Sequence, residues 1–236
     1  MGSRWAESAL SWWEEAGVDT LIGEEPRDWL NARADAAAGP ANAAPAPAPT
    51  EAPPDSLAAF QDWLAATDSL PFASPAATRI APAGDPAAGL MVMTDMPTAE
   101  DAAAGMIFSG EAGALVERML AAIGRSRETI YLVPFSPIRP PAGRIDPAGV
   151  RMLTEIARHH VGLAAPRALL IFGDSCSRAL LGEPMTAARG RWHDLDTPAG
   201  PVRALVTIRP QELLTQPKLK AHAWADLQML MEGLKP

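Results

Sequence analysis

The stretch TIYLVPFSPIRPPAGR, residues 129–144, begins as an apolar run and ends as a loop that contains three further prolines. A short apolar run of this kind, bounded by proline, is typical of a strand that is buried on both faces of a sheet. In an open parallel sheet, ligands usually bind beside the loops that follow the carboxyl ends of the strands. The stretch therefore predicts a buried strand that ends at Pro134, followed by a loop at the location of an active site.

Apolar runs of the same kind recur along the chain, in GLMVMTD (89–95), RALLIFG (167–173) and VRALVTI (202–208). Segments with helical spacing lie between them and after them, at residues 111–124, 146–162, 174–182 and 217–234. Strands that alternate with helices predict a mainly parallel sheet with helices on both faces. The expected fold class is a three-layer α/β/α sandwich around a four-stranded sheet.

The predicted α/β domain occupies residues 55–236. It begins with a helix for which Asp55 or Ser56 provides the N-cap. The residues before this domain fall into two parts. Residues 1–33 are a predicted amphipathic helical segment, and residues 34–54 are an Ala/Pro-rich stretch typical of a semi-rigid linker.

The N-terminal segment carries several tryptophans. Trp5 and Trp13 lie on one face of the predicted helix, and the glutamates lie largely off that face. Because an isolated helix of this length is marginal in water, it needs a surface on which to pack. It either docks on the domain or binds a protein partner, and Trp5, Trp12 and Trp13 are the residues expected to make the contact.

The charge and hydropathy of the chain limit the classes of function. The formal net charge of −8 gives no overall attraction to nucleic acid or to an anionic membrane, although it is compatible with a local basic patch. No apolar run approaches the roughly 20 residues that span a bilayer. The start of the chain lacks the basic region of a secretory signal. We therefore expect a cytoplasmic protein with no membrane partner.

Metal and cofactor sites have little support in the sequence. Cys176 is the single cysteine, which excludes an intrachain disulfide and a cysteine-ligated zinc or iron–sulfur site within one chain. His193 and His222 have no partner at metal-ligand spacing. We expect neither a metal nor another cofactor.

The segment IFGDSCSRALL, residues 171–181, predicts a strand, a tight turn and a helix. The nucleophile elbow of serine hydrolases has this arrangement, but it also needs glycines flanking the nucleophile, and neither Ser175 nor Cys176 has them. We therefore expect Asp174 or Ser175 to cap the helix and Cys176 to be buried as a small apolar side chain.

Four motifs follow one another along the chain: GEAGALVERMLAAIG (110–124), IRPPAGR (138–144), RGRWH (189–193) and PKLKAHAWADLQ (217–228). In this order they resemble motifs of the uracil-DNA glycosylase superfamily, in particular its bacterial iron–sulfur branch, which is family 4-like. The resemblance runs from about residue 56 to the end of the chain. It implies the three-layer fold, a connection with DNA repair, and a reaction in which a uracil nucleotide is flipped out of DNA and its glycosidic bond is cleaved.

That reaction needs an aromatic ring on which the base stacks and an acid near the sugar. By resemblance, Phe108 in IFSG takes the stacking position, and Asp95 in TDMPTAED (94–101) takes the acid position. Thr94 and Thr98 replace two family glycines, and branched residues hinder a close backbone approach to a substrate. Phe108 is either the stacking ring or part of the core, and Asp95 either orients a water or caps the following turn.

The reaction also needs an amide that reads the uracil edge and a group that stabilises the departing anion. By resemblance, Pro134 occupies the asparagine position, and its lack of any side-chain donor or acceptor removes that function. Arg209 in RPQELL (209–214) occupies the position of the family histidine. It either stabilises an anion or forms an ion pair with Asp95 or Glu212.

One cysteine position of the family cluster corresponds to Ile138, and another falls at or near Leu70. The resemblance therefore implies a relative without the iron–sulfur cluster. Arg139 and Arg144 flank the proline loop and are candidate contacts to DNA phosphates, which would give weak binding through a local patch only.

These replacements predict a divergent uracil-DNA glycosylase-like protein that is connected with DNA repair. Its base excision is impaired or altered, and it has a binding or scaffold role. The alternative is an active DNA glycosylase that hydrolyses the N-glycosidic bond of uracil or another modified base. That enzyme would use Phe108 for stacking, Asp95 as the acid and Arg209 to stabilise the anion.

Overall fold

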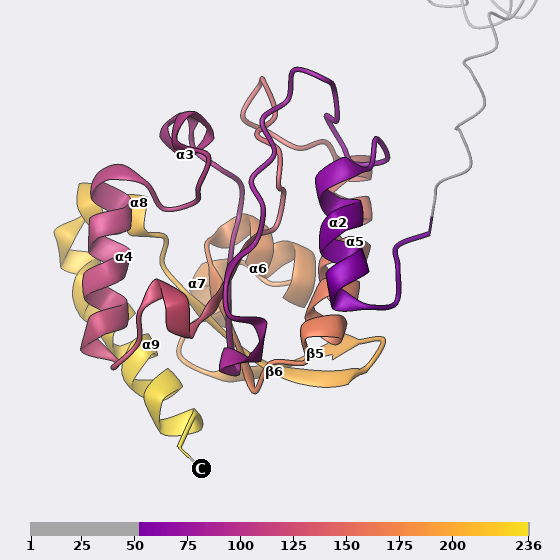
Figure 1. The fold of residues 1–236 in the computed structure, drawn as a ribbon. Helices are drawn as coiled ribbons and strands as arrows, with labels where there is room; N and C mark the ends of the chain where they lie inside the picture. Colours follow the sequence, from indigo (N-terminus) through magenta and orange to yellow (C-terminus); the bar gives the residue numbers. More distant parts are fainter. Residues whose placement is uncertain (1–51, 236) are drawn as a thin grey trace, which may run out of the picture. The chain divides into compact units, whose positions relative to one another are not determined.

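The computed structural model describes residues 52–235 (Figure 1). The predicted segment 1–33, with its three candidate tryptophans, lies outside the described residues, as does all but the end of the linker. The domain is built on one sheet with the strand order β1-β3-β2-β4-β6-β5. Within residues 52–235, no helix is both long and apolar enough to cross a lipid bilayer.

The four expected strands are confirmed and run parallel to one another at the centre of the sheet. They are β2 (Leu90–Thr94), β3 (Tyr131–Pro134), β4 (Ala168–Phe172) and β6 (Gly200–Thr207). Every residue of β2, β3 and β4 is buried. Burial on both faces explains why these strands are continuous apolar runs with no polar alternation.

The prediction of a four-stranded sheet was wrong in number, because an antiparallel strand extends each edge. β1 (Ala83–Gly84) is only two residues long and exposed, and β5 (Trp192–Thr197) pairs with β6 as a hairpin. In β5, only Leu195 is buried. Neither edge strand has an apolar run, so the pattern that identified the central strands does not mark these two.

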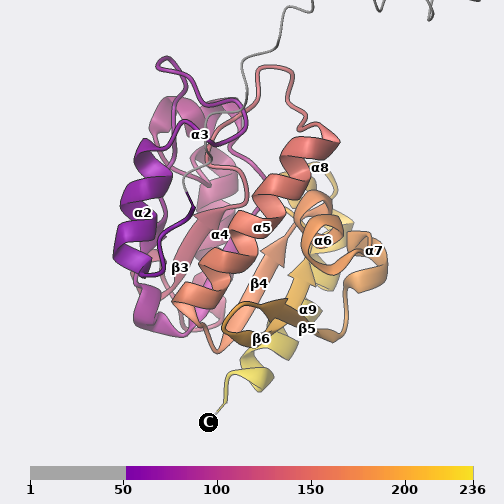
Figure 2. The same cartoon turned by 90° about the vertical axis from the view of Figure 1, so that its right-hand side faces the viewer.

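Helices cover both faces of the sheet (Figures 1 and 2). In chain order they are α2 (Leu57–Ala66), α3 (Ala99–Ala104), α4 (Gly110–Ala122), α5 (Pro147–Ala164), α6 (Asp174–Leu181), α7 (Met185–Ala188), α8 (Pro210–Thr215) and α9 (Lys220–Gly233). Short 3₁₀ turns precede β2, β3 and α9. Of the two candidate caps for the first helix, Ser56 is the N-cap, and its hydroxyl accepts from the backbone N–H of Ala59 at 3.4 Å.

Alternation along β2 divides the core into two layers. Met91 and Met93 pack in a cluster with α2 and α5, whereas Leu90 and Val92 pack in a second cluster with α4 and α9. Successive side chains of a strand point to opposite faces, so a single strand supplies both layers. The three-layer α/β/α arrangement follows directly from this alternation.

A buried polar network lies within the first of these layers. The amide of Gln61 donates to the hydroxyl oxygen of Tyr131 at 2.7 Å, and this hydroxyl lies 2.8 Å from Nε2 of His160. Because the tyrosine oxygen accepts from Gln61, its own hydrogen is free to be donated to a neutral His160 ring. Burial lowers the pKa of His160 to about 3, so the ring stays uncharged at neutral pH.

Acidification should therefore destabilise the domain through His160. The unfolded chain binds a proton at this histidine below its ordinary pKa of 6.5, whereas the folded chain does not until about pH 3. Between these values the residue should lower the free energy of unfolding by about 1.4 kcal/mol per pH unit. Urea denaturation between pH 6.5 and pH 5 should show a shallower pH dependence for His160→Gln than for the wild type. His222→Gln, at an exposed histidine, is the control and should keep the wild-type slope.

Candidate functional site

The parallel strands end together at one edge of the sheet. Thr94 pairs in register with Pro134 on one side and with Phe172 on the other, and Phe172 pairs with Thr207. Residues that follow these strand ends are therefore neighbours, although they lie far apart in the sequence. This register brings Asp95 and the loops after β3, β4 and β6 to the edge at which open α/β sheets usually bind ligands.

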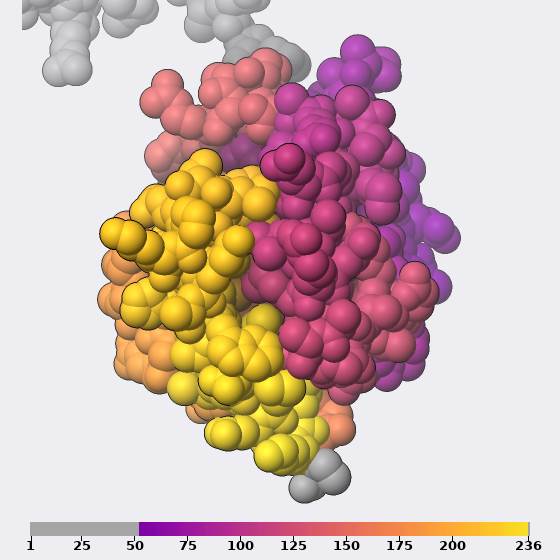
Figure 3. Space-filling view, turned by 90° about the vertical axis from the view of Figure 1, so that its left-hand side faces the viewer, coloured from indigo at the N-terminus to yellow at the C-terminus, as the bar shows by residue number. Residues whose placement is uncertain are grey.

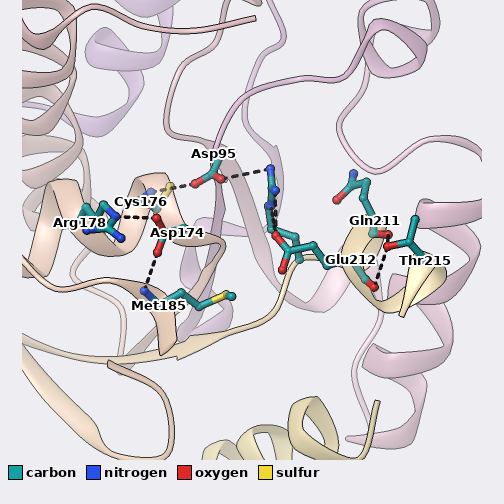
Figure 4. A network of polar contacts seen from close by, with 9 residues as sticks. Asp95, Asp174, Cys176, Arg178, Met185, Gln211, Glu212 and Thr215 are labelled. Atoms are coloured by element: carbon teal, nitrogen blue, oxygen red, sulfur yellow. Dashed lines mark hydrogen bonds and ion pairs between the residues drawn. The ribbon is translucent and has the colours of Figure 1, made fainter. Parts of the chain in front are cut away.

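The carboxylate of Asp95 is directed at the start of α6 (Figure 4). Its side chain is 5% exposed, and Oδ1 accepts a hydrogen bond from the backbone N–H of Cys176 at 2.8 Å. Burial raises the pKa of Asp95, while hydrogen bonds from the amides of Cys176 and Ser175 and the charge of Arg209 oppose that rise. A carboxylate that accepts from the second and third amides of a helix does what an N-cap side chain does.

The expectation that Asp174 or Ser175 caps α6 was wrong. The N-cap is Gly173, which has no side chain, and the cap is supplied from β2 by Asp95. Asp174 instead accepts from the backbone N–H of Met185 at 2.8 Å and from Nε of Arg178 at 2.6 Å. Asp174, the first residue of α6, thus holds the start of the next helix, and the capping acid is Asp95, which directly follows β2.

Cys176 is fully buried, as expected. Burial and the nearby Asp95 carboxylate raise the pKa of its thiol well above the ordinary value. A buried thiol that stays protonated is a poor nucleophile, which argues against a nucleophile elbow at this turn.

Arg209 is shared between two carboxylates. Its Nε and Nη2 donate to Oε1 of Glu212 at 3.0 and 2.8 Å, and Nη1 lies 3.6 Å from Oδ2 of Asp95. The structure thus contains both ion pairs that the sequence allowed. The arginine side chain remains 40% exposed, so its guanidinium is neutralised on one side and open to solvent on another.

Phe108 lies in the core, with only 2% of its surface exposed. Its backbone is in the left-handed region at φ 55°, and its ring meets the edge of Phe172 with centroids 5.5 Å apart. Of the two alternatives for Phe108, a stacking ring or a core side chain, this burial favours the core side chain. A base could stack on the ring only if the ring or its neighbours moved.

Two charged side chains hold the loop that carries Phe108. The carboxylate of Asp101 accepts from the backbone N–H of Ser109 at 2.8 Å and from its hydroxyl at 2.7 Å. The guanidinium of Arg127 donates to the backbone carbonyls of Ile107 and Phe108. These contacts fix an unfavourable backbone conformation from both sides.

Thr98, which the resemblance matches to a family glycine, has a structural role that was not predicted. It is the N-cap of α3. The Thr98 hydroxyl accepts from the backbone N–H of Asp101, and the Asp101 carboxylate accepts from the backbone N–H of Thr98. The spacing of Thr98 and Asp101 is that of a capping box with aspartate in place of glutamate. This local signal was present in the sequence, whereas nothing local marked Gly173 or Arg127.

The resemblance matches Pro134 and Ile138 to a base-reading asparagine and a cluster cysteine of the family. Pro134 is buried and has no side-chain hydrogen-bonding atom. Ile138 and Leu70, at the positions matched to family cysteines, are 2% and 4% exposed and belong to the apolar core. Aliphatic side chains cannot ligate iron, so these residues do not fit an iron–sulfur cluster. Among residues 52–235, no group of three or more His, Cys, Asp or Glu side chains is arranged to hold a metal ion.

The two candidate DNA-contacting arginines differ in their surroundings. Arg139 donates from Nη1 to the backbone carbonyl of Pro97 at 3.0 Å and so ties the proline loop to the loop after β2. Arg144 is exposed on the same loop. Both belong to the edge of the sheet that carries Asp95, because their loop follows β3.

Together, these features define an α/β protein in which Asp95, Arg209 and Glu212 pair with one another at the carboxyl ends of the parallel strands. Comparison with known proteins gives the class. Residues 81–228 match the model of the Uracil DNA glycosylase superfamily, which is more than half of the chain, and the chain belongs to that superfamily. It is similar to the type-4 uracil-DNA glycosylase of Pyrobaculum aerophilum, with 24% identity over 157 residues that cover 64% of this chain and 80% of that protein.

Substitution of Gly173 should test how tightly the Asp95 site is packed. A Cβ at this position would lie 2.5 Å from Oδ2 of Asp95 and 2.7 Å from Cδ of Arg209, at a φ of +103°. Gly173→Ala should therefore lower the free energy of unfolding by about 3 kcal/mol, through both strain and a displaced cap.

Gly182→Ala is the matched control. Gly182 also has a positive φ, of +74°, but nothing lies within 4 Å of its Cβ position. The substitution should therefore introduce backbone strain alone and lower the free energy of unfolding by about 1 kcal/mol. Urea denaturation followed by circular dichroism measures both variants. Equal losses in the two would contradict the close packing of Asp95 and Arg209 around Gly173.

Proposed function

We propose that this protein is a DNA glycosylase-like member of its superfamily that is connected with DNA repair, does not excise uracil efficiently, and acts through binding. One observation carries this proposal: the carboxylate in the position of the family acid accepts from the first turn of α6 and faces Arg209. An acid that is engaged in this way is not available to orient water at a sugar without giving up the cap.

Two other positions that the resemblance assigns to the site support the same proposal. Excision needs a stacking ring, an amide on the uracil edge and a group that stabilises the departing anion. The ring of Phe108 is buried, and Pro134 offers no donor. Two of these requirements therefore lack an accessible group in this arrangement of the side chains.

The balance of charge at Arg209 is also unfavourable for anion stabilisation. One guanidinium faces two carboxyl groups, those of Glu212 and Asp95. When both acids are ionised, the sum of these three groups is negative. A departing uracil anion would therefore meet no net positive charge, whereas transition-state stabilisation requires preorganised positive groups at the developing charge.

The alternative function is excision of another modified base by Phe108, Asp95 and Arg209. The observation that favours it is the 40% exposure of the Arg209 side chain at the carboxyl edge of the sheet, 3.6 Å from a carboxylate with a raised pKa. A raised carboxyl pKa and a partly open cation are features of functional sites as well as of structural pairs.

An excision assay separates the two functions. Purified protein is incubated with single- and double-stranded oligonucleotides that contain either uracil or hypoxanthine, and abasic sites are detected by alkaline cleavage. We expect no more uracil-derived product from the wild type than from Asp95→Asn, because the wild-type carboxylate is already engaged. Asp62→Asn, at an exposed carboxylate of α2, is the matched control, and a thermal melt of each variant reports folding.

Uracil excision that is present in the wild type and in Asp62→Asn, and absent in a folded Asp95→Asn, would overturn the proposal. Excision of hypoxanthine alone, with the same dependence on Asp95, would instead establish the alternative.

DNA binding through the proline loop has a separate test. Because Arg139 and Arg144 are both exposed, and Arg139 is bonded to the carbonyl of Pro97, we expect weak binding of a 20-nucleotide single strand that is lost as salt is raised. Arg144→Ala should weaken binding in a low-salt gel shift by about threefold, the loss of one phosphate contact. Arg203→Ala, at an arginine that stacks on Trp192 at the other edge of the sheet, is the control. Equal affinities of Arg144→Ala and Arg203→Ala for DNA would show that the proline loop is not part of the DNA-binding surface.

A further inference from the structure

An apolar groove runs between α4 and the pair α8 and α9, and its lining includes neither Asp95 nor Arg209. It encloses a cavity of about 220 Å³. Its lining is as follows: Leu115, Arg118, Met119 and Ala122 of α4, Leu213 of α8, and Lys220, Ala223, Trp224 and Leu227 of α9. Figure 3 shows this face, where α9 in yellow meets α4 in magenta.

The floor of the groove belongs to the core, but its wall does not. Leu213, Ala223 and Leu227 are at most 2% exposed, whereas Trp224 is 40% exposed. Trp224 is one of three large apolar side chains with such exposure among residues 52–235, and the other two, Met106 and Met152, lie elsewhere. An exposed tryptophan beside an apolar cavity is the combination found at the centres of protein interfaces.

The rim of the groove is basic. Arg118 lies on one side and Lys220 on the other, and none of the ion pairs within residues 52–235 includes either of them. The chain as a whole is acidic, with a formal net charge of −8. The positive rim is therefore a local feature that would select an acidic ligand over a basic one.

The shape of the groove favours a helix as its occupant. The lining positions recur every three or four residues along both α4 and α9, so one face of each helix forms a wall of the groove. On each helix the lining residues span eight positions, which is about 12 Å. A third amphipathic helix that contacts the groove over about two turns matches that length and can place one large apolar side chain in the cavity beside Trp224.

We propose that this groove is a docking site for an acidic amphipathic helix of a partner protein. The apolar face of this helix packs on Leu213, Leu227 and Trp224, and the acidic residues of the helix pair with Arg118 and Lys220. The lining of this groove includes neither Asp95 nor Arg209, so the proposal does not depend on whether any base is excised.

Two designed peptides test the proposal on the full chain. Both are fluorescein-labelled 14-residue helices with tryptophan and leucine at every third or fourth position. One has glutamate at the remaining positions and the other has lysine. Fluorescence anisotropy should show binding of the glutamate peptide and at least about tenfold weaker binding of the lysine peptide.

Variants of the groove locate the binding. Trp224→Ala should weaken binding of the glutamate peptide by about tenfold or more, since truncation of a central tryptophan has effects of this size. The double variant Arg118→Glu and Lys220→Glu should lose the glutamate peptide and gain the lysine peptide. Met152→Ala, at a side chain of α5 with the same 40% exposure, is the matched control and should bind as the wild type does.

All of these side chains are exposed or on the rim, so each variant should keep the wild-type circular dichroism spectrum and melting temperature. The proposal is overturned if the wild type binds neither peptide, if it binds both equally, or if Trp224→Ala and Met152→Ala bind with the same affinity.

Discussion

The carboxylate of Asp95 satisfies the amide of Cys176 at the start of α6 and faces the guanidinium of Arg209 after β6. It therefore connects the ends of β2, β4 and β6, three parallel strands that are neighbours in the sheet. Gly173 makes this connection possible, because the close approach of Asp95 and Arg209 leaves no room for a Cβ. Burial of the acid is tolerated because each of its oxygens faces a donor or a cation.

This connection uses a position that the superfamily resemblance associates with catalysis. A carboxylate serves equally well as a helix cap and as an acid near a sugar, since both uses require an acceptor at the edge of the sheet. What distinguishes them is whether the lone pairs face solvent or the protein. In this protein the carboxylate faces the protein, and the neighbouring arginine is balanced by Glu212.

Other positions that the resemblance assigns to the site are apolar or bonded within the protein. Ile138 and Leu70 fill positions of cluster ligands with core side chains, and Arg139 is bonded to a backbone carbonyl. Close packing of apolar side chains at these positions stabilises the fold. The groove between α4 and α9 is also lined mainly by apolar side chains, but one of them, Trp224, remains exposed.

The sequence alone determined the central sheet, most of the covering helices and the absence of a side-chain donor at Pro134. Apolar runs and helical spacing are local patterns, and the absence of a donor from Pro134 is a property of the residue itself. The edge strands β1 and β5 and the use of Asp95, Phe108 and Arg209 were decided only by the tertiary structure. Each depends on a partner distant in the chain, as when Asp95 caps a helix 81 residues further on. A side chain that can cap, pair or catalyse does so according to which groups the fold places beside it, and no local pattern specifies those neighbours.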